Sequence, residues 1–206
     1  GVYTQEILTE LLKAEHDFVI YASSDELKRK YPGQVTPVSP HTSPALGSKG
    51  HLARLLWQQT ILPLKLRSQK ISLLYSTVPE GIMNPLSKQK QIITVHDIIP
   101  AKYPRLHPRM KYHYFYDLPM LLKNAQVVIC DSENTKNDVI DYYKIKDKSY
   151  RVIYQGYDKE RLYPRPRGAV SKKYGLKKYL FYMGDMRPYK NLERSLEAFA
   201  DRKSVV

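Results

Sequence analysis

The sequence lacks the marks of several large classes of protein. Its 206 residues include one cysteine, Cys130, which excludes a disulfide framework within the chain and indicates a reducing compartment. The longest apolar runs are too short to cross a bilayer, and the first residues lack the basic-then-apolar layout of a signal peptide. There is no His/Cys spacing typical of a metal site, so we expect no protein-bound metal. There is also no phosphate-binding P-loop and no nucleophile elbow, which argues against P-loop proteins and hydrolases.

Acidic residues are also scarce relative to basic ones. The chain has 34 Lys and Arg against 20 Asp and Glu, a formal net charge of +14. Residues 101–206 carry 23 of the basic and 12 of the acidic side chains, so the excess lies late in the chain. Such an excess indicates an anionic partner (nucleic acid, an anionic membrane or a phosphate-bearing substrate) or simply a solvated basic surface.

Short apolar segments alternate with helical periodicities along most of the chain. The runs VVIC at 127–130 and LFYM at 180–183 are apolar at every position, as in strands of a parallel sheet that is covered on both faces. The pattern therefore predicts an α/β, doubly wound, Rossmann-like fold. Two helices are expected to bury one stripe each. The first helix, over HLARLLWQQTILPLKLRSQ at 51–69, is kinked at Pro63 and has an apolar stripe of Leu52, Leu55, Leu56, Leu62 and Leu66. The second, at 109–124, has Tyr112, Phe115 and Tyr116 on its apolar side.

In such folds the loops at the carboxyl ends of the strands lie on one edge of the sheet and bind the ligand. Polar residues follow four of the expected strands: His96-Asp97, Asp131-Ser132, Gln155-Gly156 and Gly184-Asp185. We expect them to form one rim. Ser132 also suits the N-cap of the next helix.

His96 is the candidate catalytic residue on this rim. An imidazole can move a proton near neutral pH or donate hydrogen bonds to an anion, although a histidine at a strand end is often only structural. Asp97 beside it could orient the imidazole, but a role in ordering the loop is the better interpretation.

The segment KYLFYMGDMRPYKNLERSLEAFA offers a second candidate site. Gly184 permits a tight turn after the expected strand, and Arg187 and Lys190 precede a helix N-terminus. The planar guanidinium of Arg187, the ammonium of Lys190 and the positive end of the helix dipole together form a suitable site for a diphosphate. The alternative is two surface cations in a loop.

The ordered segments resemble the GT-B glycosyltransferases of family 4, also called group 1. The matching stretches are GVYTQEILTELL, RLLWQQTILP, ITVHDIIPAKYP, VVICDSENTKNDVIDYY, YRVIYQGYDKERLYP and YLFYMGDMRPYKNLERSLEAF. They run from Gly1 to about Phe199, and the similarity is strongest to bacterial enzymes of polysaccharide or lipopolysaccharide assembly.

The resemblance implies roles at matching positions. Gly1 and Val2 match the end of the glycine-rich loop near the donor phosphate and the acceptor. His96 matches the histidine at the donor sugar. Arg187 and Lys190 match the family's basic pair at the donor diphosphate, and Gly184 matches the glycine that opens the loop carrying this pair. The resemblance also implies that no tightly bound metal is required.

The sequence departs from this family at both ends. The resemblance implies a Rossmann-like N-terminal domain over 1–164 without its first strand, a linker over 165–177, and the first strand and helix of a donor-binding domain over 178–206. The family's acidic Glu-x7-Glu region does not appear. We therefore expect a truncated form with weak or no turnover.

The expected function is that of a retaining glycosyltransferase, a hexosyltransferase such as a mannosyl- or glucosyltransferase. It would use a nucleotide-sugar donor and a saccharide or lipid-linked acceptor in the cytoplasm, with a possible peripheral contact to anionic membrane and no nucleic acid partner. Two alternatives remain. One is other GT-B chemistry, such as a nucleotide-sugar epimerase or a phosphorylase. The other is a non-catalytic basic domain that binds anionic membrane or nucleic acid.

Overall fold

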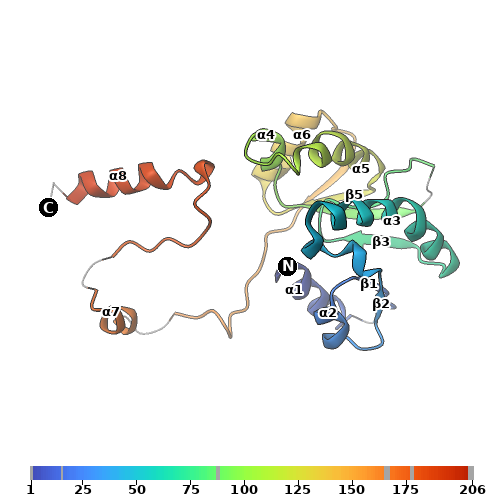
Figure 1. Cartoon of the computed structure of the whole chain (residues 1–206), viewed down its shortest axis with the longest axis horizontal. Coiled ribbons are helices and arrows are strands. Elements are labelled where there is room, and N and C mark those ends of the chain that lie inside the picture. Colours follow the sequence, from blue (N-terminus) through green and yellow to red (C-terminus); the bar gives the residue numbers. More distant parts are fainter. Residues whose placement is uncertain (1, 15, 87–88, 165–167, 177–178, 204–206) are drawn as a thin grey trace. The chain divides into compact units, whose positions relative to one another are not determined.

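The computed structural model describes residues 2–14, 16–86, 89–164, 168–176 and 179–203 (Figure 1). Contacts divide the chain into two compact units, Gly1–Gly156 and Tyr157–Val206. The domain limits expected at residues 164 and 177 stay a prediction. No helix in the described ranges combines the length and the apolar character needed to span a membrane.

The first unit has an α/β fold built on parallel strands. A two-stranded sheet pairs β1 (Ile20–Ala22) with β2 (Val35–Pro37), and a four-stranded sheet has the order β3-β4-β5-β6. Its strands are β3 (Leu73–Ser76), β4 (Lys90–Val95), β5 (Val127–Cys130) and β6 (Ser149–Val152). All the pairings are parallel, and the register aligns Val95 with Cys130. The predicted Rossmann-like α/β class is therefore confirmed.

Six α-helices and three short irregular helices connect these strands in the described part of the first unit (Figure 1). The α-helices are α1 (Val2–Leu11), α2 (Asp25–Lys30), α3 (Gly47–Ser68), α4 (Ile99–Lys102), α5 (Leu118–Asn124) and α6 (Glu133–Tyr143). The irregular ones are the 3₁₀ turns η1 (Pro40–Thr42) and η2 (Pro44–Leu46) and the π-helix η3 (His113–Asp117).

The main core lies where β4 and β5 meet the helices α5 and α6. Its members include Ile93, Val95, Val128, Leu118 and Val139, all fully buried. Each such side chain contributes about 1.5–3 kcal/mol through burial. This core fixes the ends of β4 and β5, and with them the residues that follow each strand.

The buried stripe of α3 differs from the one expected. Leu62 and Leu66 are buried, but Leu52 and Leu56 are 59% and 58% exposed. The face one turn before Leu62 is polar because the side chains of Arg54, Gln58 and Gln59 hydrogen-bond to Glu80 and Gly81. Sequence periodicity weighs only apolar residues, so it placed the stripe wrongly over the first half of the helix.

The aromatic segment before α5 was also assigned the wrong face. Tyr112 and Tyr116 are 59% and 67% exposed, and Phe115 is 37% exposed, whereas His113 and Tyr114 are buried. The imidazole of His113 is satisfied on both sides, by Asp117 at 3.0 Å and the Pro79 carbonyl at 2.8 Å. His113 and Tyr114 therefore occupy the inner face, and Tyr112 and Tyr116 turn outward.

The second unit contains helices but no strand in the part that the structure describes. Its elements are α7 (Ala169–Tyr174), the 3₁₀ turn η4 (Pro188–Lys190) and α8 (Leu192–Lys203). The helix expected over NLERSLEAFA is present as α8. The strand expected over 178–183 is not formed at 179–183, and Lys178 lies outside the described residues. A strand needs a neighbouring strand to satisfy its backbone groups, and the described residues of this unit form none.

Candidate functional site

Three polar side chains meet at the carboxyl edge of the four-stranded sheet. His96 follows β4 directly, Asp131 follows β5, and Gln155 stands three residues after β6. The Nδ1 atom of His96 lies 2.7 Å from Oδ2 of Asp131, and Gln155 Nε2 donates to the same oxygen. The parallel register brings them together, as the strand-end pattern predicted.

The imidazole of His96 faces hydrogen-bond acceptors at both nitrogens. Nε2 lies 3.0 Å from the carbonyl oxygen of Thr77, which follows β3, and Nδ1 meets the Asp131 carboxylate. Both contacts are hydrogen bonds at once only when both nitrogens carry protons. Asp131 and Thr77 therefore hold the ring between the ends of two strands.

The carboxylate of Asp131 is largely withdrawn from solvent. Its side chain is 18% exposed, and its Oδ1 atom is buried with no hydrogen-bond partner among the described residues. A carboxylate withdrawn from water needs polar partners, and the His96 imidazole and the Gln155 amide supply them at Oδ2.

The backbone around His96 is fixed by the start of α6. Ser132 accepts from the Thr135 N–H at 3.1 Å, which confirms the predicted N-cap. The Thr135 hydroxyl donates to the His96 carbonyl at 3.2 Å. Asp97 accepts from the Ile99 N–H at 2.8 Å, so it orders the loop and does not touch the imidazole.

Helix α1 supplies an aromatic wall to this edge. The Tyr3 ring stands edge-on to the imidazole, with centroids 4.7 Å apart. Its hydroxyl lies 3.2 Å from that of Tyr75, which in turn lies 3.3 Å from Thr94 Oγ1. Burial raises the pKa of Tyr75, so its hydroxyl stays neutral and able to donate a hydrogen bond. Val2, the predicted substrate contact, precedes Tyr3 and is 74% exposed. Gly1 lies outside the described residues.

The other candidate residues lie together in one loop of the second unit. Gly184 has φ +155°, a conformation that glycine adopts most readily, and the Tyr182 hydroxyl lies 3.0 Å from where its Cβ would be. The Arg187 Nε donates to Asp185 Oδ2 at 3.0 Å, with both side chains about half exposed. Lys190 ends η4 two residues before α8 begins. The two cations therefore precede a helix, as expected.

A second polar cluster lies between α3 and the loop after β3. Arg54 forks onto the two carboxylate oxygens of Glu80 at 2.7 Å each, and also donates to the Thr42 carbonyl. Burial alone would raise the pKa of Glu80, but Arg54 outweighs it and holds that pKa below its ordinary value. The Nδ1 atom of His51 lies 3.2 Å from Arg54, and burial lowers the pKa of its imidazole. This cluster joins three segments and is structural.

Sequence reasoning placed Asp131 and Gln155 on the rim but gave them no role. Tyr3 and Thr77 were missed because they reach the site from a helix start and a loop, where no strand-end rule applies. In the described ranges, no group of three or more His, Cys, Asp or Glu side chains is arranged so that it could hold a metal ion. The absence of a required metal stays a prediction.

Comparison with known proteins gives one match. The family model of Glycosyltransferase Family 4 matches residues 1–161, which include His96, Asp131 and Gln155. The chain matches no curated protein and no solved structure. Since the family model covers well over half of the sequence, the chain belongs to glycosyltransferase family 4.

Proposed function

We propose that this protein is a retaining glycosyltransferase that moves a hexose from a nucleotide-diphosphate donor to a saccharide or lipid-linked acceptor. The His96–Asp131 pair carries the proposal. It lies at the carboxyl edge of a parallel sheet, where α/β folds bind ligands, in a chain of glycosyltransferase family 4. We place the reaction in the cytoplasm, with an acceptor of bacterial polysaccharide or lipopolysaccharide assembly.

The leaving diphosphate is the group that most needs stabilisation. As the glycosidic bond lengthens, negative charge develops on the phosphate oxygens, and preorganised cations lower that barrier. Arg187 and Lys190 would meet those oxygens, with Gly184 giving the backbone room. Arg187 would exchange its contact with Asp185 for the phosphate, since a guanidinium forks equally well onto either anion. These cations would do the work of a metal, so we propose that none is required.

His96 would act at the donor sugar. Its side chain is 30% exposed, and Asp131 holds Nδ1, so the ring has one orientation. A sugar hydroxyl or phosphate oxygen would replace the Thr77 carbonyl as the acceptor from Nε2–H. The acceptor sugar or lipid would approach from α1, where Val2 and Tyr3 lie next to this edge. The acceptor's own hydroxyl is the nucleophile. Its oxygen bonds to the anomeric carbon as the bond to the diphosphate breaks, its proton passes to the departing phosphate oxygen, and no covalent protein intermediate is invoked.

The experiment is a donor panel on the protein expressed from its complete coding sequence. Release of nucleoside diphosphate, together with a new glycosidic bond whose anomeric configuration matches the donor's, is the expected result. The His96→Ala variant should lose at least tenfold in kcat/KM. A free sugar epimer or a sugar 1-phosphate as the product would support epimerase or phosphorylase chemistry and would contradict the proposal. Inversion of the anomeric centre would contradict the retaining part alone.

A further inference from the structure

The segment between α4 and α5 forms an exposed surface that combines basic and aromatic side chains. It comprises Arg105, Arg109, Lys111, Tyr112, Phe115 and Tyr116, called here the basic–aromatic surface. The two tyrosines are 59% and 67% exposed. The neighbouring Leu106 and Met110 are also exposed. The catalytic scheme above uses none of these residues.

The surface is held in place from beneath. The buried residues His107, His113 and Tyr114 fix the segment to the first unit. The Tyr143 hydroxyl donates to the Tyr114 carbonyl at 2.8 Å, and the Met110 N–H donates to the His107 carbonyl at 3.1 Å. The exposed aromatic side chains therefore stand on a rigid base, which reduces the entropy lost when they bind.

The positive charge of this surface is not compensated nearby. No acidic residue occurs between Asp97 and Asp117 in the sequence, and both of these carboxylates are engaged elsewhere. Lys102 pairs with Asp138 at 2.5 Å. By contrast, Arg105, Arg109 and Lys111 form no ion pair with any carboxylate among the described residues. The surface therefore carries two exposed cations, Arg105 and Arg109, and the half-buried cation Lys111.

A pocket of about 400 Å³ opens within the surface. Arg105, Lys111, Tyr112, Phe115 and Tyr116 line it, together with Pro104 and Pro108. Guanidinium and ammonium groups bind phosphate oxygens, and tyrosine rings are stable at the boundary between water and acyl chains. The pocket thus has the chemistry of a phospholipid headgroup site.

The same residues are less suited to other partners. A second copy would bring like-charged surfaces together, which costs free energy. Base stacking needs a free ring face. However, the Lys111 ammonium lies 4.9 Å over the Tyr112 ring, and Tyr116 stacks on that ring with centroids 6.4 Å apart and planes 10° from parallel. Insertion of ring edges at a membrane interface needs no free face.

The geometry points to an anionic phospholipid bilayer as the partner of the basic–aromatic surface. Arg105, Arg109 and Lys111 contact the headgroup phosphates, and Tyr112, Phe115 and Tyr116 enter the interface. This binding is independent of donor and acceptor chemistry, and it stands or falls separately from the proposed activity.

The first test is sedimentation of the full chain with two kinds of vesicle. One kind is a mixture of phosphatidylglycerol and phosphatidylcholine, and the other is phosphatidylcholine alone. Binding should require the anionic lipid and fall steeply with salt. At roughly 1 kcal/mol per basic residue, the triple change Arg105→Gln, Arg109→Gln and Lys111→Gln should lower the partition coefficient about 100-fold. Tyr112→Ser with Tyr116→Ser should weaken the binding that remains at high salt.

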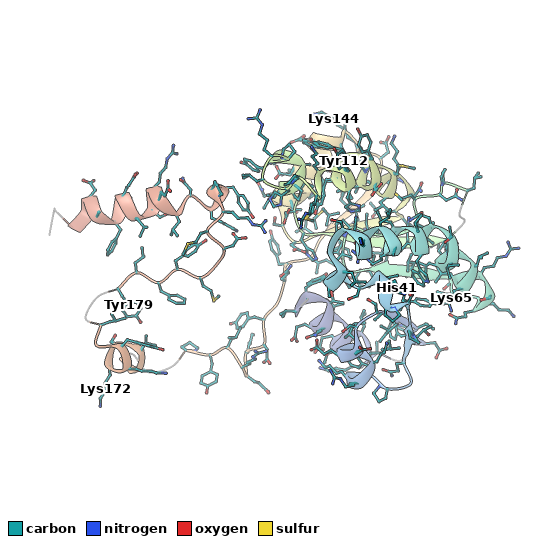
Figure 2. The ribbon with its side chains drawn as sticks, in the orientation of Figure 1. His41, Lys65, Tyr112, Lys144, Lys172 and Tyr179 are labelled. Carbon is teal, nitrogen blue, oxygen red and sulfur yellow. The ribbon has the colours of Figure 1, made fainter. Side chains whose placement is uncertain are left out.

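A matched control removes the same charge elsewhere. Lys65→Gln, Arg67→Gln and Lys70→Gln act at the end of α3, and Figure 2 labels Lys65 well away from Tyr112 on the first unit. This variant should bind within about threefold of the unaltered protein, apart from the general effect of its lower net charge. Equal losses in the two triple variants would overturn the assignment to this surface.

A second measurement does not depend on the multiple variants. Cys130 is buried, and burial raises the pKa of its thiol to about 12, so it does not react with maleimides. A fluorophore at Tyr112→Cys should therefore shift to the blue with anionic vesicles, and one at Lys65→Cys should not. An unshifted label at residue 112, binding to a single-stranded oligonucleotide in place of vesicles, or a dimer that the charge variant abolishes would each overturn the proposal.

Discussion

The Nδ1 atom of His96 lies 2.7 Å from Oδ2 of Asp131, which joins the ends of two neighbouring parallel strands. The contact follows from register, because Val95 and Cys130 are partners across β4 and β5, and His96 and Asp131 are the next residues along the chain. Strand pairing thereby places a carboxylate beside an imidazole. Asp131 is a positioning residue in this arrangement, since it acts through His96.

Asp131→Asn tests that role. The amide keeps the shape but loses the negative charge that faces Nδ1 of His96, so kcat should fall at least tenfold with KM for the donor little changed. A purely structural role would lower the stability of the fold and leave the kcat of the folded protein unchanged. Asp97→Asn is the matched control and should keep full activity, since an Asn oxygen still accepts from the Ile99 N–H.

Lys190→Ala and Arg187→Ala test the diphosphate site. Each should lower kcat/KM at least tenfold, because a cation near the leaving group stabilises the transition state more than the ground state. Nucleoside diphosphate release by the protein from its complete coding sequence is the measurement. Asp185→Asn is the control. It frees Arg187 from its ion pair, so activity should be unchanged or higher. Full turnover in both alanine variants would remove these residues from the site.

Residues that directly follow parallel strands gather at one edge of the sheet, which explains why much of the site could be predicted from the sequence. His96, Asp131 and Gln155 each follow an apolar run, and parallel pairing brings such positions to one edge whatever the side chains. Tyr3 and Thr77 follow no such rule. Their contacts depend on how α1 and the loop after β3 pack, and long-range packing leaves no periodic signal in one sequence.

The failures of sequence reasoning share a cause. Arg54 and His113 occupy inner faces of helices, where periodicity expects apolar residues, because each has a hydrogen-bond partner far away in the sequence: Glu80 for Arg54 and the Pro79 carbonyl for His113. The residues of the apolar run at 179–183 favour a β-strand. A strand also needs a neighbouring strand to pair with, and local sequence preference gives no information about that neighbour.

Gln91→Leu tests a buried contact that the sequence did not indicate. The Gln91 side chain, on β4, accepts from the Ile82 N–H at 3.1 Å and donates to the Ile82 carbonyl at 2.8 Å. All these groups are buried, so the leucine would leave two backbone groups without partners, at a cost of about 3 kcal/mol in the free energy of unfolding. Urea unfolding followed by circular dichroism measures it. Gln126→Leu, at an exposed glutamine, is the control and should change stability by less than about 0.5 kcal/mol.

Acidification should destabilise the fold through Glu80 and His51. Both groups have a pKa below the ordinary value in the folded chain, so the unfolded chain binds more protons and the free energy of unfolding falls as the pH falls. The contribution of His51 is fully present above its unfolded value of 6.5 and is lost as the pH drops through its folded pKa.

The contribution of Glu80 is complete above 4.5 and is lost at lower pH, as its folded pKa is passed. Urea midpoints between pH 8 and pH 3 should therefore decline in two stages. His51→Gln should flatten the first stage and Glu80→Gln the second. Glu10→Gln, at an exposed site on α1, should leave both unchanged because its carboxylate lies outside this cluster. Midpoints that rise on acidification would show that the Arg54 pair does not hold Glu80 ionised in the fold.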